Sequence, residues 1–160
     1  MKYPNRNFLL IVLIFLAVNF RAKSQQTINN PIALDSVFKK RADSLRASFA
    51  KDGFVIVKEA KMTMESEYEM PVIVPLKEGS WYEFAFIGDV SSRLYEVRMY
   101  DETEKQVVYL KHYGNGMESN IISYSYIPKF SAYHVIKPLQ LNKKKKKNLC
   151  GYIMMFKKVS

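Results

Sequence analysis

The chain has 160 residues, of which 25 are Lys or Arg and 15 are Asp or Glu, so its formal net charge is +10. Hydrophobic residues make up 48% of the chain and aromatic residues 14%, which excludes an intrinsically disordered protein. The single cysteine excludes a fold held by internal disulfides and a zinc cluster built from several cysteines.

Residues 1–24 have the pattern of a signal peptide that is removed on export. Lys2 and Arg6 form a basic start, residues 8–18 are all apolar, and Ala22 and Ser24 place small side chains before a cleavage site after Ser24. The apolar run has 11 residues, whereas a membrane-spanning helix needs about 20. We therefore expect a mature chain without a transmembrane segment, located in the periplasm, at the cell surface or in the medium. Removal of these 24 residues leaves 136 residues, which is enough for one domain. Four of the removed residues are basic and none is acidic, so the net charge of the mature chain is +6.

Residues 25–31 form a polar N-terminal segment, and the sequence after it predicts one amphipathic helix over residues 32–51. Pro31 is typical of a helix start and Gly53 of a helix end. Apolar residues recur at helical spacing along this segment at Leu34, Phe38, Ala42, Leu45 and Phe49. We expect this apolar face to pack on a sheet of the same domain, and docking of a partner on it is the alternative.

From Phe54 onward, apolar and polar residues alternate between turn residues, which is typical of antiparallel strands. The pattern predicts eight strands, at 54–62, 70–77, 81–88, 94–100, 106–113, 119–127, 132–140 and 149–158. Eight strands need two layers, so residues 32–160 are expected to form a single, mainly β domain: an antiparallel two-layer β-sandwich led by helix 32–51. Alternation assigns three sets of side chains to its core: Tyr82, Phe84 and Phe86; Tyr95, Val97 and Met99; Ile122, Tyr124 and Tyr126. Gly114, Asn115 and Gly116 are expected to form the loop of a β-hairpin.

Aromatic residues and glycines follow a distinctive order in the second half of the chain. The segments that carry it are GSWYEF (79–84), GD (88–89), VRMYD (97–101), SAYHV (131–135) and GYIMMF (151–156). Over about residues 70–158, this order resembles the bacterial pre-peptidase C-terminal domain, a secreted jelly-roll-like β-sandwich appended to exported hydrolases. The resemblance implies that the sandwich is jelly-roll-like and that the protein is a non-catalytic accessory or binding module. Loops of that family are usually rich in Asp that can hold calcium, whereas the corresponding loops here carry mixed charge, so calcium binding is not supported.

The sequence contains no motif that marks a catalytic or metal site. G-x-S-x-G, H-E-x-x-H, a phosphate-binding glycine loop and an EF-hand loop are all absent from it. His112 and His134 have no His, Cys or carboxylate neighbour at ligand spacing, so we expect them at the surface or in the core. Asp101, Glu102 and Glu104 are more typical of a solvated turn than of a calcium site or an acid–base pair. We therefore expect no enzyme, no catalytic or metal-binding residue and no cofactor.

The most conspicuous local feature is a run of five lysines, Lys143, Lys144, Lys145, Lys146 and Lys147. Repulsion between adjacent charges excludes their burial, so we expect an exposed loop between the last two strands. This loop is either a solvated hairpin tip or a contact for anionic partners such as lipid head groups, acidic glycan or extracellular DNA.

Trp81 lies beside a turn and is the candidate platform for a sugar ring. Cys150 alternates with apolar residues of the last strand, so burial is expected rather than an intermolecular disulfide or a reactive thiol. Tyrosines at alternating strand positions are expected in the core rather than at a surface where bases could stack on them. Export likewise argues against intracellular nucleic acid as a partner.

These features predict an exported, non-catalytic β-sandwich that acts as an accessory or ligand-binding module at the bacterial cell envelope. Its expected partners are envelope proteins, glycans or anionic surfaces. Two alternatives remain open. One is a structural or interaction component of a surface assembly that docks through the helix or a sheet edge. The other is a small hydrolase whose active-site residues are scattered along the chain.

Overall fold

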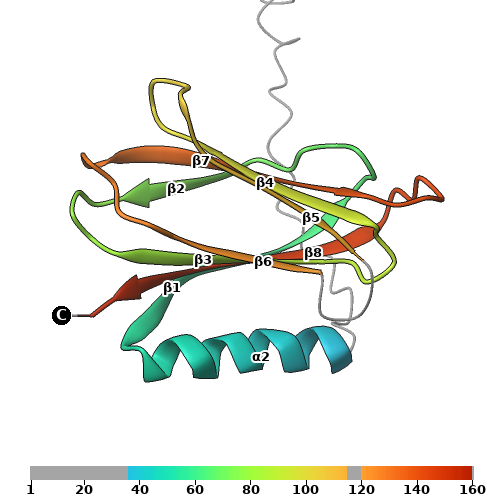
Figure 1. The fold of residues 1–160 in the computed structure, drawn as a ribbon, viewed down its shortest axis with the longest axis horizontal. Coiled ribbons are helices and arrows are strands. Elements are labelled where there is room, and N and C mark those ends of the chain that lie inside the picture. The colour runs from blue at the N-terminus through green and yellow to red at the C-terminus, as the bar shows by residue number, and fades with distance from the viewer. Residues whose placement is uncertain (1–35, 115–119, 160) are drawn as a thin grey trace, which may run out of the picture. The chain divides into compact units, whose positions relative to one another are not determined.

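The computed structural model describes residues 36–114 and 120–159, which form one helix and eight strands (Figure 1). The elements are α2 (Ser36–Lys51), β1 (Phe54–Met64), β2 (Val72–Leu76), β3 (Tyr82–Gly88), β4 (Leu94–Tyr100), β5 (Gln106–Tyr113), β6 (Ile121–Tyr126), β7 (Ala132–Leu141) and β8 (Leu149–Lys158). The predicted helix and the predicted strands are thus confirmed, with strand ends that differ by at most two residues. The expected signal peptide 1–24, the polar segment 25–31 and Leu34 lie outside the described residues.

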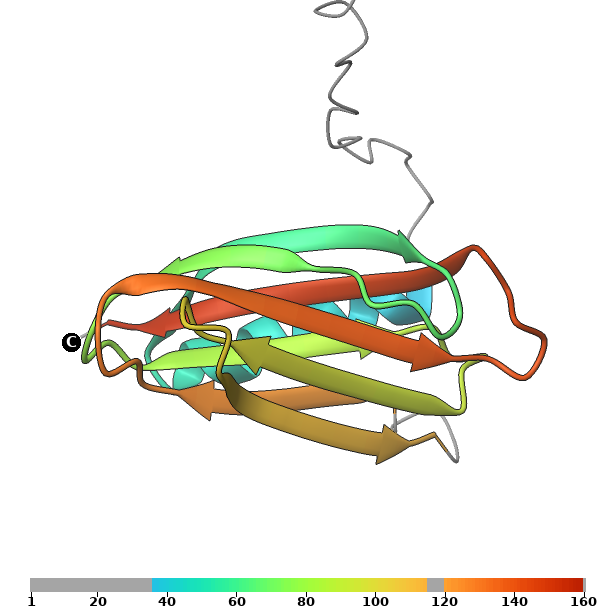
Figure 2. The ribbon, with the colours of Figure 1, turned by 90° about the horizontal axis from the view of Figure 1, so that it is seen from above.

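The strands form two antiparallel sheets, sheet A with the order β1-β8-β3-β6 and sheet B with the order β2-β7-β4-β5. The pairs β1–β8, β2–β7, β3–β6 and β4–β5 are nested, as in one long hairpin whose tip joins β4 to β5. The pairs β3–β8 and β4–β7 arise where this hairpin is rolled up (Figure 2). This is the topology of a jelly roll, and the predicted jelly-roll-like sandwich is confirmed.

The rolled topology also shows that two hairpin expectations were wrong. Strand β5 belongs to sheet B and β6 to sheet A, so Gly114 leads into a crossover between sheets and not into a hairpin; Asn115 and Gly116 lie outside the described residues. The five lysines likewise join β7 of sheet B to β8 of sheet A, so they are not a hairpin tip.

The core between the two sheets contains the side chains that alternation assigned to it. Its buried members include Tyr82, Phe84, Phe86, Tyr95, Val97, Met99 and Ile122, and Tyr124 and Tyr126 pack against them while partly exposed. Along the regular part of each strand, alternate residues point into this core. Strand β1 has a register shift between Ile56 and Lys58, so its Phe54 packs toward α2 whereas Met62 and Met64 enter the core.

A second apolar cluster lies between sheet A and α2, which covers the outer side of sheet A (Figure 1). The helix contributes Phe38, Ala42, Leu45 and Phe49, and the sheet contributes Phe54, Ala85, Ile87, Tyr152, Met154 and Phe156. The predicted packing of the helix on the sheet is confirmed for its described residues. Cys150 lies half-buried at the margin of this cluster.

Polar contacts fix the position of the helix. Arg46 donates hydrogen bonds to Asp43 (2.7 Å), Glu59 (2.6 Å) and the Tyr152 hydroxyl (2.7 Å). The hydrogen bond from the Tyr152 hydroxyl, followed by that from Arg46, holds the pKa of Glu59 below its ordinary value. The apolar face of α2 from Phe38 onward is therefore occupied by its own sheet rather than offered to a partner.

Candidate ligand-binding face

The side of the sandwich away from α2 is the solvent-facing side of sheet B, called here the sheet B face. In β4, Tyr95, Val97 and Met99 point into the core, so Glu96 and Arg98 point the other way. The antiparallel register then sets side chains of β5 and β7 beside them. Lys111 lies opposite Glu96, and Tyr109 and Lys137 lie opposite Arg98 on either side.

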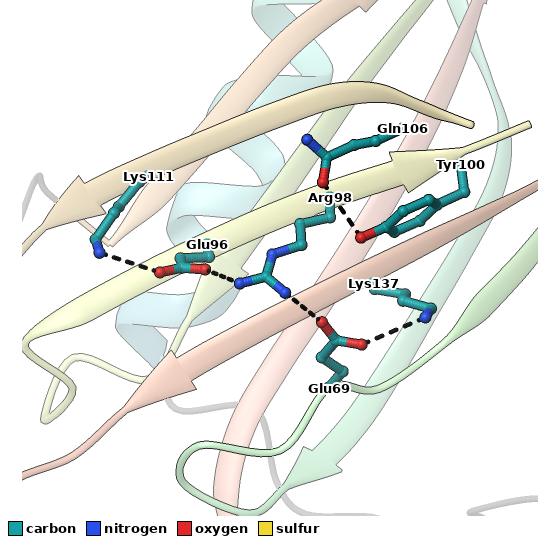
Figure 3. Close-up of polar contacts among 7 residues, drawn as sticks. All are labelled: Glu69, Glu96, Arg98, Tyr100, Gln106, Lys111 and Lys137. Carbon is teal, nitrogen blue, oxygen red and sulfur yellow. Dashed lines mark hydrogen bonds and ion pairs between the residues drawn. The ribbon is translucent and has the colours of Figure 1, made fainter. Parts of the chain in front are cut away.

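Five charged side chains on this face form a continuous ion network (Figure 3). Glu96 accepts a hydrogen bond of 2.8 Å from Arg98 and pairs with the Lys111 ammonium at 3.3 Å. The other end of the Arg98 guanidinium donates to Glu69 at 2.9 Å, and Glu69 pairs with Lys137 at 3.4 Å. Four chain segments thus converge on one patch, because Glu69 comes from the connection between β1 and β2.

The ion network fixes its members in one arrangement. The Glu96 side chain is only 7% exposed, and a carboxylate so buried is unfavourable unless cations pair with it. The hydrogen bond to Glu96 raises the pKa of Arg98, and the same carboxylate raises the pKa of Lys111. Both groups therefore stay cationic at neutral pH. The pairs made by the more exposed Glu69 add little to stability, but the network as a whole holds its donors and acceptors in one arrangement.

Aromatic rings flank the ion network at the surface. Tyr109 is 49% exposed, Tyr113 64% and Tyr133 66%, so the expectation that tyrosines at strand positions lie in the core was wrong for these three. The reason in β5 is that Val108 and Leu110 take the inward positions, which turns Tyr109 and Tyr113 to solvent.

Each cation of this face lies close to a tyrosine ring. The Arg98 guanidinium carbon is 5.7 Å from the ring centroid of Tyr109, and the Lys111 ammonium is 5.5 Å from that of Tyr113. The Lys137 ammonium is 4.9 Å from the ring of Tyr100, whose hydroxyl donates to Gln106 at 3.2 Å. Such contacts hold a ring in place without covering all of it.

Trp81, the predicted sugar platform, lies elsewhere, just before β3 of sheet A. It is 43% exposed, and its ring makes an edge contact with Phe54, with 5.4 Å between the centroids. The Lys158 ammonium lies 5.6 Å from the Trp81 ring centroid. This ring thus has a cation beside it, as the tyrosines of the sheet B face do, but Trp81 belongs to the other sheet and does not join the sheet B face.

The five lysines, from here on the lysine loop, are all exposed, as predicted. Their backbone is nevertheless ordered by hydrogen bonds, from the Ser66 amide to the Lys146 carbonyl (2.9 Å) and from the Lys145 amide to the Asn142 carbonyl (3.0 Å). The loop precedes β8, whereas Trp81 lies beside the other end of that ten-residue strand. The two predicted sites are therefore far apart.

The remaining polar candidates are not brought together into one site. Asp101 accepts hydrogen bonds from the Thr103 hydroxyl (2.6 Å) and the Thr103 and Lys105 amides (2.9 and 3.1 Å), and these bonds lower its pKa and stabilise the β4–β5 turn. His134 is buried and His112 is exposed on β5. Within residues 36–114 and 120–159, no three or more His, Cys, Asp or Glu side chains are grouped to hold a metal ion. No helix in the same ranges is long and apolar enough to cross a membrane.

An open cleft of about 280 Å³ lies where the edge strands β5 and β6 approach each other. Its lining consists of Leu110, Lys111, His112, Ile121, Ile122 and Ser123. Lys111 also belongs to the ion network, so the cleft adjoins the sheet B face at its β5 edge.

No protein-family model matches the chain, and no curated protein matches it. Among the solved structures that share a weak likeness with the chain are the following two. One is an arabinose-bound α-L-arabinofuranosidase, with 7% identity, a TM-score of 0.35, and coverage of 69% of this chain and 24% of that one. The other is a glycosylation-associated protein complex from Streptococcus agalactiae, with 14% identity, a TM-score of 0.31, and coverage of 66% and 39%. The chain thus spans less than half the length of either, and likenesses this weak carry no argument about function.

Proposed function

We propose that this chain is an exported, non-catalytic module that binds glycan at the bacterial cell envelope through the sheet B face. The observation that carries the proposal is the set of exposed tyrosines, Tyr109, Tyr113 and Tyr133, beside a fixed network of charged donors and acceptors. A sugar ring offers an apolar C–H face that packs on an aromatic ring. Its hydroxyl groups both donate and accept hydrogen bonds, which guanidinium, ammonium and carboxylate groups complement.

The exposure of the rings and the fixed position of the charged side chains both favour a binding role for this face. Exposed aromatic surface is unfavourable in water, and its concentration on one face marks an interaction site more often than chance exposure. Side chains already held by ion pairs lose less conformational freedom when a ligand binds, so more of the contact energy appears as affinity. The export part of the proposal rests on the apolar run of residues 8–18, which lies outside the described residues.

Removal of one exposed ring should weaken glycan binding. We expect wild-type protein to be retarded in native gels cast with xylan, mixed-linkage β-glucan, galactomannan or alginate. Tyr109→Ala should lower the affinity about fivefold, since one aromatic contact contributes about 1 kcal/mol. Arg98→Gln should also reduce retardation, because it removes the charge that holds Glu96 and Glu69 in place.

Trp81→Ala is the matched control, because it removes an exposed aromatic ring from the other sheet. It should leave retardation unchanged. Loss of retardation in Trp81→Ala together with wild-type retardation in Tyr109→Ala would move the site to Trp81. Absence of wild-type retardation in every polysaccharide gel would refute glycan binding.

The alternative role in a surface assembly has one structural observation in its favour. Strand β1 is an edge of sheet A and leaves Val55, Ile56 and Val57 exposed. The neighbouring Lys58, however, donates a hydrogen bond of 2.8 Å to the Ile73 carbonyl of edge strand β2. A lysine at a sheet edge opposes addition of a further strand, so the glycan proposal is preferred.

We also propose that the lysine loop sets any affinity for anionic surfaces without stabilising the fold through its side chains. The triple change of Lys144, Lys145 and Lys146 to Ser should leave the melting temperature unchanged. The side-chain contacts of these lysines are long and exposed, with Lys145 3.9 Å from Glu67 and Lys146 3.4 Å from Ser91.

Retention on phosphatidylglycerol vesicles at low salt should fall in the same triple variant. Each lysine near an acidic membrane contributes about 1 kcal/mol, and the attraction fades beyond about 8 Å at physiological salt. If the wild-type protein shows no retention even at low salt, the lysine loop is only a solvated loop and does not bind anionic surfaces. A sharp fall in melting temperature would instead reveal a structural role for these lysines.

A further inference from the structure

The outward-pointing tyrosines of the sheet B face follow a line rather than a scatter; Tyr109, Tyr113 and Tyr133 are exposed, and Tyr100 is partly buried. Tyr113 and Tyr109 both point outward from β5 and are four residues apart, which separates them by roughly 13 Å along the strand. Both lie on the edge strand of sheet B, where the line begins.

The register carries this line across the neighbouring strands. Arg98 of β4 lies opposite Tyr109, so Tyr100, two residues further along β4, is its diagonal neighbour at roughly 7–8 Å. Tyr100 in turn lies opposite Val135 of β7, which makes Tyr133 the next diagonal neighbour at a similar distance. The tyrosine line, Tyr113–Tyr109–Tyr100–Tyr133, therefore crosses β5, β4 and β7 in one direction and measures roughly 28 Å.

A cation accompanies each of the first three rings along the line. Lys111 lies beside Tyr113, Arg98 beside Tyr109 and Lys137 beside Tyr100. Figure 3 shows these cations in one row with Glu96 and Glu69 between them. The face thus repeats a pair that consists of one flat ring and one hydrogen-bond donor. Such a repeat matches a polymer of similar sugar units.

Resting on the proposed function, we infer that the sheet B face binds an internal stretch of a linear polysaccharide laid along the tyrosine line. Several sugar units contact the protein at once, and neither chain end is recognised because the line runs across an open sheet. Tyr109 and Tyr100 bind the middle of the stretch, and Tyr113 and Tyr133 bind its two ends.

Affinity should therefore depend on chain length. Calorimetric titration of the wild-type chain with cello-, xylo- and alginate oligosaccharides, from dimers to octamers, should show affinity that rises with length and levels off once the oligosaccharide spans the line. Tyr133→Ala and Tyr113→Ala should weaken binding of the longest oligosaccharides about fivefold. They should not weaken binding of dimers, whereas Tyr109→Ala should weaken every length.

Tyr133→Phe is the matched control, because it keeps the ring and should bind as the wild type does. Melting temperatures of all variants should stay at the wild-type value, since the three mutated rings are largely exposed. Equal affinity for dimers and octamers, with Tyr109 still required, would overturn the inference and leave the proposed function standing. No binding of any oligosaccharide or of the polysaccharides above would overturn both.

Discussion

Replacement of Phe38 by Ala should lower the free energy of unfolding by about 3 kcal/mol. Phe38 is only 8% exposed and lies in the cluster between α2 and sheet A. Its ring meets that of Tyr152 edge-on, with 6.4 Å between the centroids. Removal of the ring exposes apolar surface of β8 and leaves a void that the rigid sheet cannot close. Chemical denaturation of the wild type and the variant measures the difference.

Lys39→Ala is the control for this experiment, because Lys39 is the exposed neighbour of Phe38 on the same helix. It should change the free energy of unfolding by no more than about 0.5 kcal/mol. A similarly small effect of Phe38→Ala would mean that the helix does not depend on this contact. The apolar face of α2 would then be available to a partner, as the surface-assembly alternative requires.

The order of helix and strands could be predicted because each element carries its own period. In β3, Tyr82, Phe84 and Phe86 alternate toward the core between the sheets. Ala85 and Ile87 of the same strand are apolar as well, and they lie under α2. A strand that is apolar on both faces is the sequence signal of a sheet covered on both sides.

The connections between strands could not be predicted in the same way. A run such as Gly114-Asn115-Gly116 is compatible with a hairpin, but the choice between a hairpin and a crossover depends on the pairing of distant strands. Here β5 pairs with β4, and β6 pairs with β3. Alternation within a strand is the same in either case, so it cannot reveal the rolled topology.

The sequence carries a signal for part of the sheet B face. Glu96 and Arg98 alternate with core residues of β4, and Tyr109 alternates with Val108 and Leu110. Their outward direction follows from these positions, although Tyr109 was expected in the core with the other strand tyrosines. The ion network does not, because Glu69 and Lys137 reach Arg98 only through the register of β7 and the path of the connection after β1. Trp81 was singled out for its place beside a turn, yet its contacts with Phe54 and Lys158 come from segments distant in sequence.

Replacement of Gln140 by Leu should also lower the free energy of unfolding by about 3 kcal/mol, although Leu is the more apolar residue. The Gln140 side chain is fully buried. Its oxygen accepts hydrogen bonds from the Asp89 amide (2.8 Å) and the Ser92 hydroxyl (3.1 Å), and its nitrogen donates to the Cys150 carbonyl (3.1 Å). Leu leaves these groups without that partner, and each buried group so left costs about 1–3 kcal/mol.

Gln106→Leu is the matched control, because it makes the same change at an exposed position of β5. Its free energy of unfolding should stay within about 0.5 kcal/mol of the wild-type value.

Proteolysis is a second readout, and it separates local loosening from global unfolding. Gln140 joins the β3–β4 connection to β8, and Asn142 donates to the Ser91 carbonyl of that connection at 2.6 Å. Loss of Gln140 should therefore loosen the anchorage of the lysine loop, and trypsin should cut within this loop faster in Gln140→Leu than in Gln106→Leu. Equal stability and equal cleavage of the two variants would show that the hydrogen bonds of Gln140 do not hold this end of the sandwich together.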